Sequence, residues 1–356
     1  MASPTIDAQE SYFGRVSVQT IVLGAFVFLT VPLLIASASG VTESVPLVDL
    51  YGVTFGLTHF LVTGLLYLDA RNLRYFAANW QNRLIYLVVP AIILVGMDLL
   101  AVLRLGQVGD WLNGFLFYFI MLVNFLHVSR QSFGVLQLFK REGGGPYADP
   151  LRSLENLFFI ALVIGQFVTF AGDGRFDANS REVWLTTGIT GLLFGIVLAL
   201  HAHAWVRGEQ SRSARVPLVY FLFQALSGAL VVYRSDWVTI ALAMHYVEYH
   251  AVVMPRLFGA PVEADSRADR LRAGLARIPV LFYAGLIALA WGVWLGQRTA
   301  LYADPGASPL PVRLLLHSID GIFLFHFYVE AFLWKFSKPH YRETLGPLYF
   351  SARASS

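Results

Sequence analysis

Long apolar segments dominate the chain, and polar residues collect between them. The apolar residues form continuous stretches and do not follow the spacing of a one-sided amphipathic helix. Stretches of about 20 residues match the length that an α-helix needs to cross a bilayer. We therefore expect an all-α, polytopic transmembrane helical bundle of about ten spans. The predicted spans are 17–39, 50–68, 83–103, 111–138, 154–171, 183–205, 215–233, 236–255, 277–296 and 312–335.

Short loops connect these spans, so we expect one transmembrane domain over residues 1–356. The longest hydrophilic connection is 260–277, predicted to be a cytoplasmic loop. Asp7 and Glu10 precede the first apolar stretch, whereas a secretory signal begins with a basic region. The first stretch is therefore interpreted as a retained span.

The positions of lysine and arginine predict the orientation. With the N-terminus inside, 19 of the 26 Lys and Arg residues lie in cytoplasmic segments and six in outer segments, while Arg130 lies within a span. Cytoplasmic loops of membrane proteins carry such an excess. We expect both termini in the cytoplasm, and a bacterial inner membrane as the location. The same rule accounts for the basic residues without nucleic-acid binding.

The composition narrows the possible chemistry. The chain is 56% hydrophobic and 14% charged, and it contains no cysteine. Disulfides, thiol nucleophiles and thiolate metal ligands are therefore excluded. Any bound metal must be held by nitrogen and oxygen ligands.

Histidines are concentrated inside the predicted spans, where eight of the nine lie within or at the end of one. Ionisable groups at such depth are costly and usually face a bundle interior or a cavity. His59, His127 and His245 lie near the expected bilayer midplane, with His326 slightly nearer the cytoplasm. Four predicted helices thus carry an imidazole at similar depth, as helix-bundle metal sites do.

Carboxylates accompany two of these histidines at helical spacing. Glu248 follows His245 by three residues and Glu330 follows His326 by four, so each pair shares a helix face. His250 points about 140° away from His245 on the same helix. Imidazole and carboxylate together are ligands of non-haem iron and other divalent metals. The predicted metal ligands are His59, His127, His245, Glu248, His250, His326 and Glu330.

A second polar face of the last span carries His317 and Asp320, about opposite His326. We expect these two residues to support catalysis by delivering protons or by orienting metal ligands.

Each polar residue also has a structural interpretation. A single membrane histidine often makes only a helix–helix hydrogen bond. His201 and His203 lie at a predicted cytoplasmic span end and are expected to be interface residues. Asp98 is a candidate for an ion pair with Arg130.

The segment His245-Tyr-Val-Glu-Tyr-His250, together with His317-Ser-Ile-Asp320 and His326-Phe-Tyr-Val-Glu330 of the last span, resembles the histidine-rich membrane oxygenases and desaturases. The resemblance implies non-haem iron, oxygen-dependent oxidation of a lipid-like or apolar small molecule, and an electron donor as partner. It covers only these helices. The adjacent-histidine motif HxxHH of those families is absent, and the histidines here lie at mid-depth.

Three functions remain open. An intramembrane metal-dependent oxidoreductase accounts for the shared depth of the histidines. A bis-histidine haem protein for electron transfer needs two opposed histidines on different helices, such as His127 with His245 or His326. A proton-coupled transporter would use buried histidines and acids that titrate.

Overall fold

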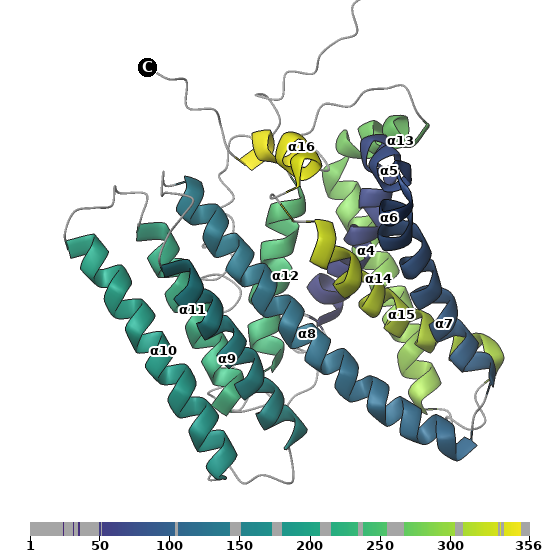
Figure 1. Ribbon diagram of the computed structural model, residues 1–356. Coiled ribbons are helices and arrows are strands. Elements are labelled where there is room, and N and C mark those ends of the chain that lie inside the picture. Colours follow the sequence, from purple (N-terminus) through teal and green to yellow (C-terminus); the bar gives the residue numbers. More distant parts are fainter. Residues whose placement is uncertain are drawn as a thin grey trace, which may run out of the picture. The chain divides into compact units, whose positions relative to one another are not determined.

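The computed structural model describes residues 52–103, 106–142, 151–172, 180–206, 215–233, 238–254, 267–302, 309–333 and 338–349, with the single residues Gly24, Val31, Ile35, Leu50 and Lys335. These residues are helical, without strands (Figure 1). In chain order the elements are η4 (Gly52–Leu57), α4 (Thr58–Gly64), η5 (Leu65–Leu68), α5 (Ala70–Ala77), α6 (Trp80–Arg83), η6 (Leu84–Val88), α7 (Val89–Leu103), α8 (Gly106–Glu142), α9 (Leu151–Ala171), α10 (Arg181–Val206), α11 (Arg215–Tyr233), α12 (Val238–Met254), α13 (Arg267–Ala276), α14 (Pro279–Tyr302), α15 (Leu310–Leu333) and α16 (Pro339–Tyr349).

Six helical segments are long and apolar enough to cross a membrane, or seven if the bent segment 52–77 counts as one. The all-α prediction is thus confirmed for the described residues, and the chain has the features of a multi-pass membrane protein. In each predicted span from 50–68 onward, nearly all of the residues that the structure describes are helical. The span 17–39 lies outside the described residues, apart from three single positions. The six spanning segments are Trp80–Leu100, Gly114–Lys140, Leu151–Ala171, Arg181–Val206, Pro279–Gly296 and Arg313–Leu333.

The chain divides into two compact units. Unit 1 contains 47–120 and 249–356, and unit 2 contains 121–248 with 18–46; residues 1–17 are grouped with unit 1. The boundaries fall inside two helices, α8 and α12. Glu248 is therefore assigned to unit 2 and its neighbour Tyr249 to unit 1. Each unit has its own buried residues and is described separately below.

A sharp bend follows the first described helical segment of unit 1. The chain turns by 75° between 52–68 and α5. Asp69 is extended at the bend, and its carboxylate accepts hydrogen bonds from the backbone N–H groups of Arg71 and Asn72. An Asp side chain at this position satisfies N–H groups that have no partner in the first turn of a helix. The Asn72 side chain donates to Leu66 O, which satisfies a carbonyl on the other side of the bend.

Pro90 stands at the second position of α7 and has no N–H group. Tyr86 lies in the π-helical segment η6 just before this proline. The Tyr67 hydroxyl donates to the Tyr86 carbonyl at 2.8 Å. This hydrogen bond connects the first segment of unit 1 to the start of the next span.

Helices α7 and α15 pack closely in unit 1. A Cβ atom on Gly321 of α15 would lie 3.3 Å from Met97 Cβ of α7. Ser318 of α15 donates to Asp98 of α7 at 2.7 Å. Val53, Ala290 and Ile319 are buried together where η4, α14 and α15 meet. These contacts hold α15 in place along the apolar interior of its unit.

Helices α9 and α11 pack closely in unit 2. Gly228 leaves room for Leu162, whose Cδ2 would lie only 2.4 Å from an added Cβ. Gln166 and Thr169 of α9 donate to backbone carbonyls of α11, at 3.2 and 2.8 Å. Small residues that allow close backbone approach, together with interhelical polar contacts, are typical of helix packing in membranes.

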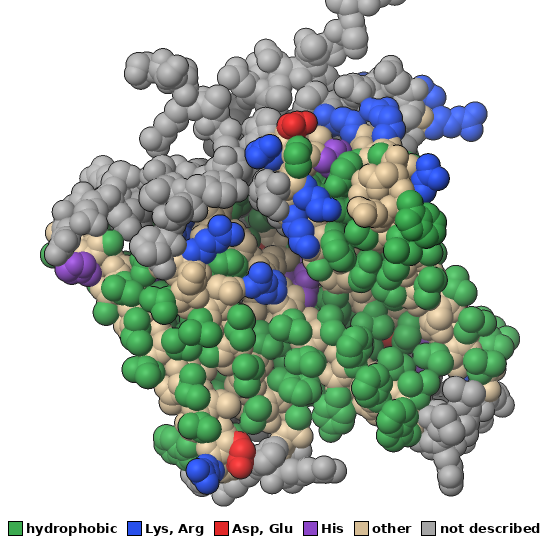
Figure 2. Space-filling view, in the orientation of Figure 1, with side chains coloured by type: hydrophobic (Ala, Val, Ile, Leu, Met, Phe, Trp, Pro, Cys, Tyr) green, Lys and Arg blue, Asp and Glu red, His purple; other side chains and the backbone are tan. Residues whose placement is uncertain are grey.

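The outward faces of several helices are apolar (Figure 2). On α10 the exposed side chains include Trp184, Leu185 and Leu192, and on α14 they include Val280 and Leu281. Apolar outer faces suit contact with lipid chains, because the bilayer core offers no partner for polar groups.

Candidate functional site

Two histidines of unit 1 face each other from helices far apart in the sequence. His59 on α4 and His326 on α15 place their Nε2 atoms 2.8 Å apart. Both side chains are fully buried. The predicted convergence of these two positions is therefore present in unit 1. Since each is an imidazole, a proton or a metal ion must lie between the two nitrogen lone pairs to make this approach favourable.

A chain of short contacts extends from His326 away from His59. The Nδ1 atom of His326 lies 2.6 Å from the Thr63 hydroxyl, which lies 2.5 Å from the Tyr249 hydroxyl. Tyr249 donates to Glu330 Oε1 at 2.6 Å, and the same carboxylate oxygen lies 3.5 Å from Thr63. Glu330, predicted as a metal ligand, is thus connected to His326 through two hydroxyl groups. All four side chains are buried.

Aromatic rings surround the pair. The Phe60 ring lies 5.2 Å from the His59 ring and 4.9 Å from the His326 ring, measured between centroids. Tyr249 approaches His59 to 4.1 Å, and Phe327 approaches His326 to 5.6 Å. The two imidazoles therefore lie in an apolar setting, where polar contacts are stronger than in water.

His250 lies beside this pair. Its ring centroid is 6.2 Å from that of His59. Its Nε2 lies 3.3 Å from Phe55 O and its Nδ1 lies 3.4 Å from the Tyr283 hydroxyl. Both ring nitrogens of this predicted ligand thus have protein partners, at the long end of the hydrogen-bond range.

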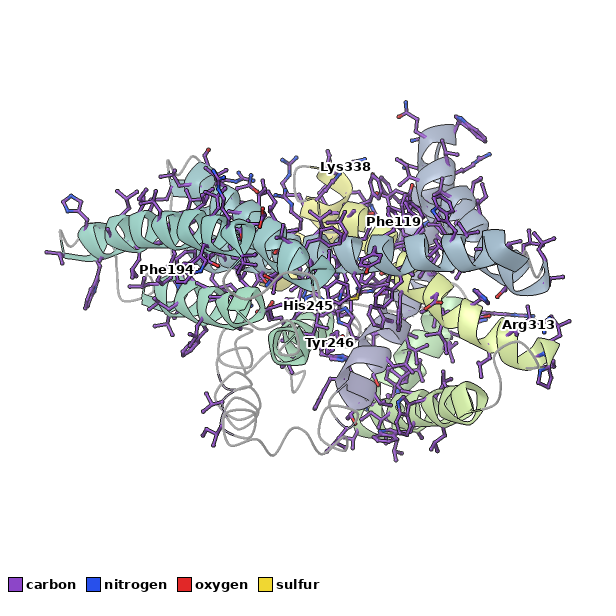
Figure 3. All side chains as sticks on the ribbon, turned by 90° about the horizontal axis from the view of Figure 1, so that it is seen from below. Phe119, Phe194, His245, Tyr246, Arg313 and Lys338 are labelled. Atoms are coloured by element: carbon purple, nitrogen blue, oxygen red, sulfur yellow. The ribbon has the colours of Figure 1, made fainter. Side chains whose placement is uncertain are left out.

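Unit 2 contains a second pair, His127 on α8 and His245 on α12. Their ring centroids are 5.0 Å apart and the rings are perpendicular. Their ring nitrogens lie within 4.8 Å of each other, which is close enough to hold a metal ion. Gln131, one turn after His127, donates to the His245 carbonyl at 3.4 Å. Figure 3 shows His245 and its neighbour Tyr246 on α12, viewed nearly along the helix axis.

Glu248 is directed at α11 and is fully buried. Its Oε1 accepts hydrogen bonds from Tyr220, at 2.9 Å, and from Gln224. The Ser132 hydroxyl also lies near this carboxylate. His245 and Glu248 share a helix but contact different helices, α8 and α11.

The predicted catalytic pair lies elsewhere on α15. Asp320 lies six residues before His326, about 9 Å from it along the helix axis. His317 lies nine residues before His326, about 13 Å from it. Both side chains are half-buried.

Asp98 and Arg130, considered as an ion pair, each have a hydrogen-bond partner inside their own unit. The Asp98 carboxylate accepts a hydrogen bond from Ser318, and Arg130 donates one to Asn156.

One buried carboxylate of unit 2 was not among the predicted site residues. Glu155 of α9 is fully buried and contacts Lys140 at 2.9 Å and His201 at 2.8 Å. Gln137 also donates to it, at 2.8 Å. His201 of α10 thus contacts a carboxylate of another helix, whereas His203 is exposed. The position of Glu155 in the first turn of the predicted span 154–171 could have identified it as a candidate. Thr63, Tyr249 and Tyr220 carried no such signal, because hydroxyl residues are common in spans.

No protein-family model, no curated protein and no solved structure matches this chain. The geometry of the two histidine pairs therefore carries the functional argument.

Proposed function

We propose that this chain is an intramembrane metal-dependent oxidoreductase that binds non-haem iron through histidine nitrogens and acts on an apolar or lipid-like substrate. The observation that carries the proposal is the approach of His59 Nε2 to His326 Nε2, at 2.8 Å in a fully buried position. His127 and His245 of unit 2 are proposed as a second pair of ligands.

The His59–His326 geometry is close to that of two ligands on one ion. Metal–nitrogen distances of about 2.0–2.1 Å at a tetrahedral angle place two ligand nitrogens about 3.3 Å apart. The pair would need to open by about 0.5 Å to hold an ion. The nitrogen-rich, thiolate-free donor set suits iron, copper or zinc better than magnesium or calcium.

The surroundings favour an apolar substrate. Phe60 and Phe327 contact His326, and Phe323 lies 4.3 Å from Phe60 between ring centroids. A bound iron ion would supply oxygen activation and electron transfer. The protein would orient the ligands, exclude water and present the substrate from the bilayer.

A bis-histidine haem protein is less compatible with unit 1. Haem ligation places the porphyrin plane between two imidazoles. The rings of His59 and His326 are in direct contact, with centroids 4.4 Å apart and Phe60 and Tyr249 against them. An absorption spectrum tests this alternative, because haem gives an intense Soret band.

A proton-coupled carrier is a second candidate, favoured by the buried Glu155–Lys140–His201 cluster of unit 2. Intramembrane ionisable groups commonly mark proton or ion pathways. Proton uptake by protein reconstituted in liposomes, abolished by Glu155→Gln, would support this candidate. A stoichiometric metal with no uptake would support the oxidoreductase.

Metal analysis of detergent-purified protein tests the main proposal. We expect stoichiometric iron in the wild type and loss of metal in His59→Ala and His326→Ala. His127→Ala with His245→Ala tests the second pair, and metal counts per chain assign ions to the pairs. His203→Ala, an exposed histidine at the end of α10, is the matched control and should retain the metal. A metal-free wild type, or metal unchanged in the His59 and His326 variants, would refute the proposal.

A further inference from the structure

We infer that Thr63 and Tyr249 are positioning residues that fix the tautomer of His326, so that Nε2 presents its lone pair towards His59. This inference rests on the proposed function, because the lone pair matters only if Nε2 binds a metal. It adds two residues that neither carry charge nor belong to the predicted ligand set.

The contacts form one continuous line. It runs from His326 Nδ1 to Thr63 Oγ1 at 2.6 Å, then to the Tyr249 hydroxyl at 2.5 Å, then to Glu330 Oε1 at 2.6 Å. The residues come from α4, α12 and α15, and all four are assigned to unit 1. Each is at most 5% exposed, so water does not compete for these hydrogen bonds.

The number of protons determines the direction of this line. An ionised carboxylate only accepts hydrogen bonds, and each hydroxyl has a single proton to donate. Tyr249 therefore gives its proton to Glu330, and its oxygen accepts from Thr63. With its proton used, Thr63 can only accept from His326. The proton of a neutral His326 must then be on Nδ1, which leaves the Nε2 lone pair free for a ligand role.

The opposite order would have a different result. If Thr63 donated to His326 Nδ1, the imidazole proton would lie on Nε2 and would block metal binding there. Metal-bound histidines usually donate their other ring N–H to an oxygen partner, and losing that partner costs about 10–100-fold in metal affinity. Thr63 is that partner here, and Tyr249 and Glu330 orient Thr63. Glu330 then contributes its charge through two hydroxyl groups rather than by ligation.

Isosteric variants separate this role from packing. Thr63→Val removes the hydroxyl at nearly constant volume, Thr63→Ser retains it, and Tyr249→Phe removes only the phenolic oxygen. Tyr283→Phe is the control, since this hydroxyl contacts His250. We expect iron to bind about 10–100-fold more weakly in Thr63→Val and Tyr249→Phe, with Thr63→Ser and Tyr283→Phe close to wild type.

Nitrogen-15 NMR of histidine-labelled, metal-free protein reads the tautomer directly. We expect the His326 signal, assigned from its loss in His326→Gln, to show a protonated Nδ1 in the wild type and a shift towards the other tautomer in Thr63→Val. A protonated Nε2 in the wild type, or unchanged iron affinity in Thr63→Val, would overturn the inference. The wild-type spectrum needs neither a stable Thr63 variant nor a bound metal, so its result is separate from that of the metal analysis.

Discussion

Glu155 on α9 and His201 on α10 lie 2.8 Å apart in the interior of unit 2, with Lys140 of α8 on the same carboxylate. Three helices thus meet at one buried acid. The cost of removing such a charge from water is offset only while its partners are present.

Removal of the Glu155 partners should therefore destabilise unit 2 strongly. We expect Lys140→Met to lower the free energy of unfolding by up to about 3–5 kcal/mol, because the buried Glu155 loses its lysine partner and keeps only His201 and Gln137. Replacing all three groups together, with Glu155→Gln, Lys140→Met and His201→Leu, should lower the free energy of unfolding by less than Lys140→Met alone. Unfolding in mixed micelles measures both, with the exposed Glu182→Gln as control. Equal loss in the single and triple variants would contradict this account.

Gly228 should be sensitive to the smallest added side chain. An alanine Cβ would lie 2.4 Å from Leu162 Cδ2, so Gly228→Ala should destabilise by about 1–3 kcal/mol through overpacking. Leu162→Ala in the same chain should recover part of that loss. Gly188→Ala on α10 is the control, because an added Cβ there has nothing within 4 Å. The double-variant cycle of unfolding energies gives the coupling, and a coupling of zero would show that the helices can separate freely.

Metal binding should appear as thermal stabilisation. A ligand at 100 times its dissociation constant stabilises the native state by about 2.7 kcal/mol. We expect ferrous iron to raise the unfolding temperature of the chelator-treated wild type and to leave unchanged that of a variant in which His59, His127, His245 and His326 are all replaced by alanine. Differential scanning fluorimetry provides the measurement. An equal rise in both proteins would indicate binding elsewhere.

The absence of cysteine makes single-cysteine labelling a direct test of the predicted topology. Arg74 and Arg342 are exposed and lie in predicted cytoplasmic segments, whereas exposed Glu182 lies in a predicted outer one. In intact cells a membrane-impermeant maleimide should label Glu182→Cys and leave Arg74→Cys and Arg342→Cys unlabelled until lysis. Labelling of Arg342→Cys in intact cells would place the C-terminal segment outside.

Apolar segment length by itself determined where the helices lie. All described residues of the predicted span 215–233 lie in α11, and all described residues of the span 236–255 lie in α12. The bilayer imposes this correspondence, because a spanning segment must be apolar and must satisfy its backbone internally. The bend at Asp69 was not predicted, because it depends on side chains that cap a helix end and hydrogen-bond across a short polar connection.

Sequence alone also indicated that His59 and His326 lie at similar depth, because depth follows from position along a span. Only the tertiary structure decided what each polar group contacts. Glu248 and His245 share a predicted face, yet one meets Tyr220 on α11 and the other meets His127 on α8. Neutral Thr63 and Tyr249 link His326 to Glu330, although neither stands out in an apolar segment. Helical spacing predicts the face of a side chain, but its partners depend on how the helices are rotated and packed.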